Sequence, residues 1–344
     1  MRNGIISGGN WIIDHVKIID TLPQRGMLAN IKEEMTGTGG SPYNVLLGLA
    51  KMQANLPLWA MGVIGDDADG KFILEDLQRH GIDAAGMTAT AAAPTSYTDV
   101  MTEAQTGART FFHCRGANAL LGYEHFIGVR APAKIFHLGY LLLLDRLDQE
   151  DAEFGVAAAR VLAHMRQMGY KTSVDVVSEQ SDRFNRIVVP CLPHVDYLIV
   201  NEIEAGAVTG LPIRTGEGKI DSGNLHQAAA ALLDSGVKDL VAIHFPEGGY
   251  ARTREGLRRF EPSFLVEAGE IRGTAGAGDA FCTGMLYGLH QGWPLDEALT
   301  LANANARFNL LSPTCTGGAV PLGQLEAYIK SSPRRTDVIS MPAG

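Results

Sequence analysis

The segment Gly273-Thr274-Ala275-Gly276-Ala277-Gly278-Asp279-Ala280-Phe281 leads from a run of small residues into a helical pattern. Small residues then recur at every fourth position through Gly284 and Gly288, which predicts one packed face of a helix. The preceding glycines therefore stand at a helix N-terminus, where unpaired N–H groups and the helix dipole favour an anion. An Asp at this point could accept a proton from a hydroxyl group held against that anion. Phosphoryl transfer to an alcohol needs this pairing of an anion site with a base.

The same segment also fits a purely structural role. A glycine-rich turn before a helix can serve tight packing alone, and an Asp in the first turn of a helix often only complements the dipole. The rest of the sequence has to distinguish these two interpretations.

The composition restricts the class of protein. The chain has 344 residues, which is enough for one large α/β domain or two ordinary ones, and 46% of them are apolar. The formal net charge is −9, whereas nucleic acids and anionic membranes attract basic patches. We therefore expect neither nucleic acid nor a membrane as the main partner.

The four cysteines are widely spaced and include no CxxC pair, which favours reduced thiols over a disulfide framework or a zinc site. The N-terminus lacks a basic region followed by an apolar run, and the longest apolar stretch, residues 138–144, is too short to span a bilayer. These features predict a cytoplasmic protein.

Short apolar runs alternate with helical patterns along most of the chain, which is typical of a parallel sheet with crossover helices. The expected strands are residues 4–7, 59–64, 135–138, 172–176, 197–200 and 240–244. Besides the helix that begins near residue 280, the expected helices are residues 42–53, 70–80, 150–168, 224–233 and 295–310.

Two segments depart from this alternation. Residues 12–35 and 95–114 read as antiparallel strands with hairpin turns at 23–26 and 105–107, and we interpret them as a small β-sheet lid over the carboxyl ends of the strands. The predicted domains are then a large nucleotide- and substrate-binding domain, the lid and a C-terminal tail. They comprise residues 1–11, 36–94 and 115–330 for the large domain, 12–35 and 95–114 for the lid, and 331–344 for the tail.

Several ordered motifs, spread over nearly the whole length, resemble those of the ribokinase/PfkB family of carbohydrate and nucleoside kinases. They are Gly39-Gly40-Ser41-Pro42-Tyr43-Asn44, Met61-Gly62-Val63-Ile64-Gly65-Asp66-Asp67 with Gly70, Gly116-Ala117-Asn118-Ala119-Leu120, Asn201-Glu202-Ile203-Glu204 and Gly276-Ala277-Gly278-Asp279. The resemblance implies an α/β fold of the ribokinase-like type: a mostly parallel, doubly wound sheet with helices on both faces and a small β-sheet lid. It also implies transfer of the ATP γ-phosphate to a hydroxyl group of a sugar-like molecule, with Mg²⁺.

The resemblance assigns roles to individual residues. Asp279 is the expected general base, and the amides of Gly276, Ala277 and Gly278 are expected to stabilise the transferred phosphoryl group. The expected substrate contacts are Asp14, Gly39, Gly40 and Asn44. The expected nucleotide contacts are Asn201, His244, Gly249, Thr274 and Asn303, and Glu202 and Glu204 are expected to organise Mg²⁺ through its waters.

Structural alternatives stand beside these roles. The glycines could form tight turns, and Asp14 and Asn44 could be caps. Histidines in or beside apolar strands, including His244, are more often packed than catalytic. Arg109 and Arg115 flank a lid strand and could contact substrate or lie at a surface.

Three positions differ from the family pattern. Gly273 stands where the C-terminal signature usually begins with Asp, which puts metal handling or rate in question. Pro246 interrupts the nucleotide loop that begins at His244, and a proline removes an amide donor and fixes φ. Gly139 and Tyr140 occupy the place of a sugar-contacting Glu in ribokinase proper, which weakens a ribose assignment.

Two other functions are compatible with these residues. One is a nucleoside kinase on the same fold, because Tyr140 or Phe112 could stack on a base. The other is a non-catalytic sugar or nucleotide sensor, which the substitutions at Gly273 and Pro246 would favour. The exposed edge of a β lid also predicts a homodimer formed through the lid.

Overall fold

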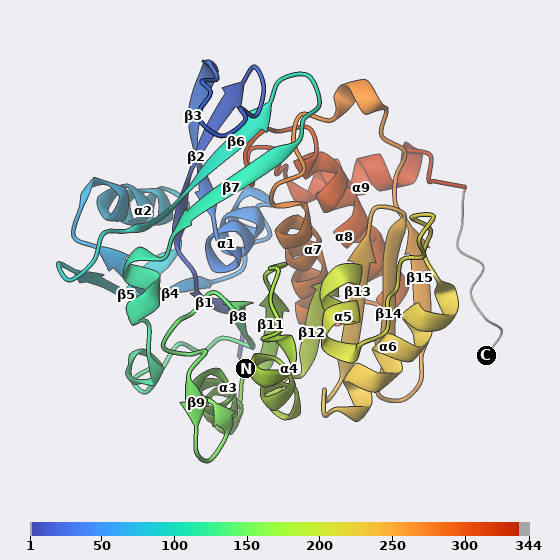
Figure 1. Ribbon diagram of the computed structural model, residues 1–344. Helices are drawn as coiled ribbons and strands as arrows, with labels where there is room; N and C mark the ends of the chain where they lie inside the picture. The colour runs from blue at the N-terminus through green and yellow to red at the C-terminus, as the bar shows by residue number, and fades with distance from the viewer. Residues whose placement is uncertain (1, 337–344) are drawn as a thin grey trace.

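Two β-sheets organise the computed structural model, which describes residues 2–336 (Figure 1). The larger sheet has nine strands in the order β15-β14-β13-β12-β11-β8-β1-β4-β5. All neighbours from β13 to β5 pair in parallel, whereas β14 and β15 add an antiparallel edge. The strands are β1 (Ile5–Gly9), β4 (Leu58–Gly65), β5 (Asp83–Thr90), β8 (Ile135–Leu141), β11 (Lys171–Val176), β12 (Tyr197–Asn201), β13 (Leu240–Phe245), β14 (Gly248–Thr253) and β15 (Arg258–Pro262).

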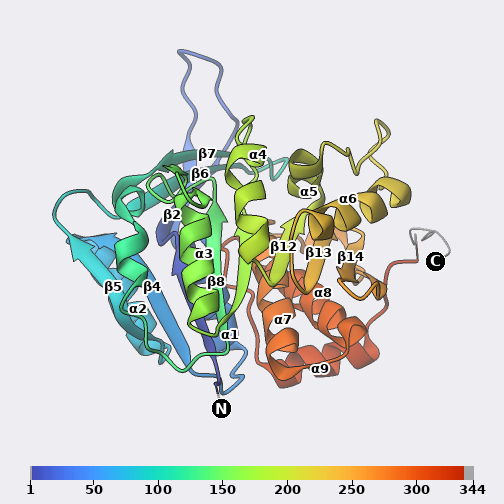
Figure 2. The same cartoon turned by 90° about the horizontal axis from the view of Figure 1, so that it is seen from below.

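Helices cover both faces of this sheet (Figure 2). Successive side chains of a strand point to opposite faces, so Ile5 belongs to the core cluster that includes residues of α1, α2, α7, α8 and α9. Ile6 belongs to the core cluster on the other face, which includes residues of α3, α4, α5 and α6. Because both faces are buried, the central strands read as continuous apolar runs. The helices are α1 (Ser41–Lys51), α2 (Ala68–Arg79), α3 (Ala157–Gln167), α4 (Phe184–Ile187), α5 (Glu202–Thr209), α6 (Ser222–Asp234), α7 (Ala277–Gln291), α8 (Leu295–Asn309) and α9 (Leu322–Ser331), with short 3-10 turns η1 (Gly116–Leu120), η2 (Tyr123–Phe126), η3 (Val189–His194) and η4 (Ala268–Glu270).

The smaller sheet has the order β3-β2-β6-β7 and is formed by β2 (Ile12–Ile19), β3 (Ile31–Gly39), β6 (Ser96–Glu103) and β7 (Arg109–Cys114). Its central pair, β2 and β6, is parallel, and both outer pairs are antiparallel. The hairpin between β2 and β3 extends away from the rest of the molecule (Figure 2). The predicted fold class is confirmed, although β3 continues to Gly39, past the predicted lid boundary at residue 35.

One predicted helix is wrong in its first part. Residues 150–168 were expected to be helical, but Glu150–Asp151 (β9) and Gly155–Val156 (β10) form a short hairpin, and α3 begins only at Ala157. The carboxylate of Asp151 accepts hydrogen bonds from the amides of Glu153 and Phe154, and Gly155 has a φ of 80°. These local interactions form a turn that competes with the helix.

The ends of the chain add two further facts. The amide of Leu265 donates to the carbonyl of Pro333, and that of Arg335 to the carbonyl of Ser263, so the start of the predicted tail packs against the large domain. Residues 337–344 of that tail lie outside the described residues. Among the helices of the described part, none combines the length and the apolar character needed to cross a bilayer.

Candidate active site

Two cavities meet at the carboxyl ends of the parallel strands. The first has a volume of about 400 Å³ and lies beneath the small sheet, whose β2 and β7 contribute Ile12, Asp14, Phe111 and His113 to its wall. The second has a volume of about 750 Å³ and is lined by α7, α8 and the segment after β15. Both are lined by Asn201, His244 and Gly278, so these residues stand at the junction of the two spaces.

All the predicted site residues line one or both of the cavities, with one exception. The first cavity is lined by Asp14, Gly39, Gly40, Asn44, Glu204, Gly276 and Asp279, and the second by Glu202, Thr274, Ala277 and Asn303, in addition to the three shared residues. The exception is Gly249, which lines neither. A side chain there would meet Phe281 and Leu299, so this glycine permits close packing rather than a nucleotide contact.

The N-terminus of α7 lies between the cavities and carries free backbone donors. Gly276 caps the helix with a φ of 74°, which a glycine adopts without strain. The amides of Gly278 and Asp279 donate to no acceptor in residues 2–336, whereas the amide of Ala277 makes a long 3.4 Å contact with the carbonyl of Thr274. Free amides at the positive end of a 15-residue helix can bind an anion.

Asp279 lies one residue farther along α7, and its carboxylate is almost fully buried. Its Oδ2 accepts a 2.7 Å hydrogen bond from the Asn44 side-chain amide, and the Tyr140 hydroxyl lies 2.7 Å from Oδ1 and 2.8 Å from Oδ2. Burial and the nearby Asp175 carboxylate raise the pKa of Asp279 to about 7, against the opposing effect of these hydrogen bonds. A carboxyl with a pKa near 7 is suited to proton transfer at neutral pH.

Sequence analysis did not single out Asp175, which stands at the end of β11 beside Asp279. Its Oδ2 lies 3.5 Å from Nε2 of His137, and its Oδ1 is buried and has no hydrogen-bond partner in the described part of the chain. His137 also contacts the hydroxyl groups of Ser41 and Ser173, at 2.8 and 3.2 Å, which agrees with the packed role expected for it. The position of Asp175 at the carboxyl end of a buried strand was the signal in the sequence that could have identified it.

The substrate-side residues are held by close backbone packing. Gly39 faces the Asp14 carboxylate, and Gly40, at a φ of 85°, faces the carbonyl of Asn10, so a side chain at either position would clash. Burial raises the pKa of Asp14 to about 7, with a further contribution from Asp279. Asp14 thus lies in the first cavity as a hydrogen-bonding group rather than as a cap.

Asn201 and Glu204 form a capping box at the start of α5. The Asn201 side chain accepts hydrogen bonds from the amides of Ile203 and Glu204, and the Glu204 carboxylate accepts from the amide of Asn201. Burial raises the pKa of Glu204 to about 8, and the negative charges of Asp175 and Glu202 act in the same direction. Asn201 and Glu204 therefore stabilise the start of α5, and both side chains also line the first cavity.

Glu202 differs from Glu204 because it already has a cation. Arg214 Nε donates to Glu202 at 2.8 Å, and the same guanidinium holds both oxygens of Glu247, at 3.0 and 2.9 Å. The expected metal role of Glu202 is accordingly not retained, since its charge is neutralised by Arg214. This network also fixes the loop around Pro246, whose carbonyl accepts a 2.7 Å bond from Ser263.

His244 and Asn303 line the second cavity in different ways. The His244 ring is packed against Phe281, with ring centroids 5.0 Å apart, and makes no hydrogen bond within the described residues. Burial lowers the pKa of His244 to about 4, so the ring is neutral at pH 7. Asn303 donates to the carbonyl of Glu261 at 2.9 Å, which leaves its side-chain oxygen available.

The departure at Gly273 has a structural explanation. A side chain there would meet the carbonyl of Ser312 and the Cα of Pro313, and Gly273 lines neither cavity. The backbone around this position therefore leaves no room for the Asp of the family signature.

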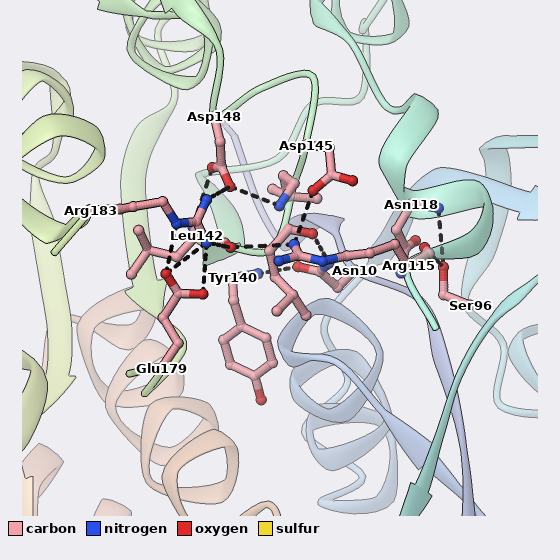
Figure 3. A network of polar contacts seen from close by, with 12 residues as sticks. Asn10, Ser96, Arg115, Asn118, Tyr140, Leu142, Asp145, Asp148, Glu179 and Arg183 are labelled. Carbon is pink, nitrogen blue, oxygen red and sulfur yellow. Dashed lines mark hydrogen bonds and ion pairs between the residues drawn. The ribbon is translucent and has the colours of Figure 1, made fainter. Parts of the chain in front are cut away.

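The lid strand β7 presents Phe111, not Phe112, to the first cavity, because alternate residues of a strand face opposite sides. Phe112 is 55% exposed on the other side, so the stacking role considered for it is not retained. Arg115 also points elsewhere: it pairs with Asp145 at 3.1 Å, in the network that surrounds the backbone of Leu142 (Figure 3).

Comparison with known proteins gives consistent results. A family model described as "pfkB family carbohydrate kinase" matches residues 5–321. The chain is 26% identical to a ribokinase of Arabidopsis thaliana over 94% of this chain and 76% of that protein. It is 22% identical to a 5-dehydro-2-deoxygluconokinase of Geobacillus thermodenitrificans over 85% of this chain and 84% of that protein.

Solved structures show the same fold. The structure of Arabidopsis thaliana ribokinase with ribose and ATP superposes with a TM-score of 0.74 at 22% identity, covering 96% of this chain and 99% of that one. An Escherichia coli structure, a putative ribokinase II in complex with ATP and Mg²⁺, superposes with a TM-score of 0.73 at 19% identity, covering 95% and 99%.

Proposed function

Because this chain belongs to the pfkB family of carbohydrate kinases, we propose that it transfers the γ-phosphoryl group of ATP to a hydroxyl of a sugar or sugar-like alcohol, with Asp279 as general base. Family membership makes the chain an ATP-dependent carbohydrate kinase. The acceptor and the roles of the individual side chains are our own assignments.

The observation that carries this proposal is the position of Asp279. It lies in the first cavity, one residue beyond the free amide of Gly278, which belongs to both cavities. A hydroxyl bound in the first cavity would therefore meet a base and an anion site at once. Asp279 accepts the proton of the attacking hydroxyl, while the free amides stabilise charge on the transferred group.

The assignment of the cavities follows from their linings. Asp14 and Asn44 supply acceptors and a donor to the sugar hydroxyls in the first cavity, where Gly39 and Gly40 allow close approach of the backbone. ATP occupies the second cavity, with its base near Asn303 and its phosphates directed toward the junction at His244, Asn201 and Gly278. The neutral His244 ring can donate a hydrogen bond to a phosphate oxygen.

Two carboxyl groups in the wall of the first cavity, those of Asp175 and Glu204, also fit a magnesium ion. Within residues 2–336, Asp175 has a buried carboxylate oxygen without a hydrogen-bond partner, and the Glu204 carboxyl group has only neutral hydrogen-bond partners. A hard divalent cation prefers such oxygen ligands and usually keeps several waters. Glu204 would hold the ion through these waters, and the bound ion would neutralise charge on the phosphates.

The small sheet supports a proposal about assembly. Apolar side chains are exposed on the β2–β3 hairpin: Leu22 by 46%, Met27 by 71%, Leu28 by 82% and Ile31 by 53%. The adjacent β3 is an edge strand of its sheet. We infer a homodimer through this surface, and sedimentation of the wild type against a Met27→Lys, Leu28→Lys double variant tests it: the variant should sediment as a monomer, and an unchanged pattern contradicts the inference.

The experiment that tests the function is ATP consumption with Mg²⁺ across a panel of sugars, sugar acids, polyols and nucleosides. Consumption that depends on a sugar-like substrate supports the proposal. Consumption that depends only on nucleosides would instead identify the nucleoside kinase. Nucleotide binding by calorimetry together with no turnover on any member of the panel would favour the non-catalytic sensor.

A further inference from the structure

Among the described residues, Tyr140 is the one neutral side chain that reaches both oxygens of the candidate base, because its hydroxyl lies 2.7 Å from Oδ1 and 2.8 Å from Oδ2 of Asp279. Asn44 contacts Oδ2 alone, at 2.7 Å. Within residues 2–336, Oδ1 therefore has only Tyr140 as a hydrogen-bond partner. A hydroxyl entering the first cavity can take Oδ1 if the tyrosine keeps its bond to Oδ2.

We propose that Tyr140 is the positioning residue of this base: it holds the Asp279 carboxylate in place and passes Oδ1 to the substrate hydroxyl while remaining bonded to Oδ2. This inference rests on the proposed function, because it assumes that Asp279 takes the proton. Tyr140, near the end of β8, would then act on the Asp279 carboxylate.

The backbone that carries Tyr140 is held independently of Asp279 (Figure 3). The Tyr140 amide donates to Oδ1 of Asn10 at 2.6 Å, and the Asn10 side-chain amide donates to the carbonyl of Leu143 at 3.0 Å. The carbonyl of Leu142 accepts bonds from both Arg115 and Arg183, at 3.3 and 2.8 Å.

A carboxylate on the same segment completes this network. The amides of Leu142 and Leu144 donate to Asp148, each at 3.2 Å. Side chains from the residue after β1, from the residue before η1 and from the residue before α4 thus converge on Tyr140 and the residues that follow it. In Figure 3 the tyrosine ring points away from this network, so its hydroxyl is presented to the base from a fixed support.

The Tyr140 hydroxyl affects the pKa of Asp279. Burial and the charge of Asp175 raise the pKa of Asp279, whereas the hydrogen bonds from Tyr140 and Asn44 lower it. Desolvation and the two carboxylates keep the Tyr140 hydroxyl protonated by raising its pKa. The titratable groups that face Asp279 are Asp14 from β2, His137 and Tyr140 from β8, Asp175 from β11, Cys282 from α7 and Cys315 from the segment before α9.

The test is the pH profile of kcat/KM in Tyr140→Phe. The rate should fall at low pH as the base becomes protonated. Without the hydroxyl the ionised carboxylate loses a hydrogen bond, so this acid limb should move to higher pH by about one to two units. A Tyr140→Phe protein that unfolds like the wild type and keeps its acid limb in place overturns the inference.

A matched control separates this effect from the loss of a buried tyrosine hydroxyl in general. Tyr43 is buried in α1 and donates a 2.8 Å bond to the carboxylate of Asp76, which lines neither cavity. Tyr43→Phe should lower the unfolding temperature without moving the acid limb. An equal shift in both variants would mean that the profile reports general stability, and would also overturn the inference.

A second probe applies if Tyr140→Phe fails to fold. Site-specific 3-fluorotyrosine at position 140 preserves the shape of the side chain and makes the phenol a stronger donor, so the acid limb should move to lower pH. An unmoved limb overturns the inference. Failure of the proposed function looks different, because Asp279→Asn would then remain active, whereas failure of the present inference leaves Asp279→Asn inactive.

Discussion

Asn44 and Asp279 are 235 positions apart in the sequence, and the side-chain amide of Asn44 donates a 2.7 Å hydrogen bond to the Asp279 carboxylate. Their helices, α1 and α7, pack together where Gly48 lies against Thr283, and a side chain on Gly48 would come within 2.9 Å of the threonine hydroxyl. Close contact of the two helices thus brings a substrate-side amide to the candidate base. The site depends on helix packing as well as on the motifs themselves.

Replacement of the base should remove activity without loss of the fold. In Asp279→Asn we expect kcat to fall by at least about 100-fold, since an amide cannot accept the hydroxyl proton. Its oxygen can still accept a bond from Tyr140 or Asn44, so the unfolding temperature should not decrease. Steady-state kinetics and thermal unfolding measure the two effects.

Asp76→Asn is the matched control for that variant, because Asp76 is also a buried, hydrogen-bonded carboxylate but lines neither cavity. It should retain most of the activity. Activity of Asp279→Asn within tenfold of the Asp76→Asn value would contradict the assigned base.

A methyl group at the junction of the cavities should impair both substrates. The Cβ of Gly278→Ala would lie 3.1 Å from the His244 ring, so ring and helix must move apart. We expect kcat/KM to fall by about 10- to 100-fold for ATP and for the sugar, because small displacements at a reacting centre have large effects. Gly323→Ala, also at the second position of a helix but with open space around it, should behave like the wild type.

The magnesium requirement should depend on Glu204 and not on Glu202. Glu204→Gln keeps an acceptor for the capping box but loses the charge, and the Mg²⁺ concentration that gives half-maximal activity should rise about tenfold. Glu202→Gln loses only the ion pair with Arg214 and should leave this concentration unchanged. The opposite pattern would transfer the metal role to Glu202.

The stability of the free protein should reflect the raised pKa of Asp14. The native state holds this proton up to about pH 7, whereas the unfolded chain releases it near its ordinary value of 3.8. Between these values the native state binds more protons, so the free energy of unfolding falls as pH rises. In Asp14→Asn this slope should be smaller, by up to about 1.4 kcal/mol per pH unit.

Urea unfolding between pH 4 and 8 measures that slope. Asp20→Asn provides the comparison, because hydrogen bonds from Asn30 lower the pKa of Asp20 and its removal should not reduce the slope. Equal slopes in Asp14→Asn and the wild type would show that Asp14 does not titrate as described.

Some of the structure could be predicted because it is encoded over short distances. Alternating apolar runs and helical patterns predicted the parallel sheet, since each central strand is buried on both faces. The segment after Gly273 predicted a helix N-terminus with free amides at Gly278, because helix ends leave such groups unpaired by their geometry. The failure at 150–168 arose where a side chain, Asp151, bonds its own backbone and offers an alternative to the helix.

The sequence by itself determined the family, the order of the elements and the short motifs, because each of these is a property of neighbouring residues. Only the tertiary structure decided which groups share an environment: that Asp175 raises the pKa of Asp279, that Arg214 neutralises Glu202, and that Tyr140 and Asn44 divide the oxygens of one carboxylate. Charges and hydrogen bonds act through space over a few ångströms. Their partners here come from distant parts of the chain, and no local pattern specifies the packing that brings them together.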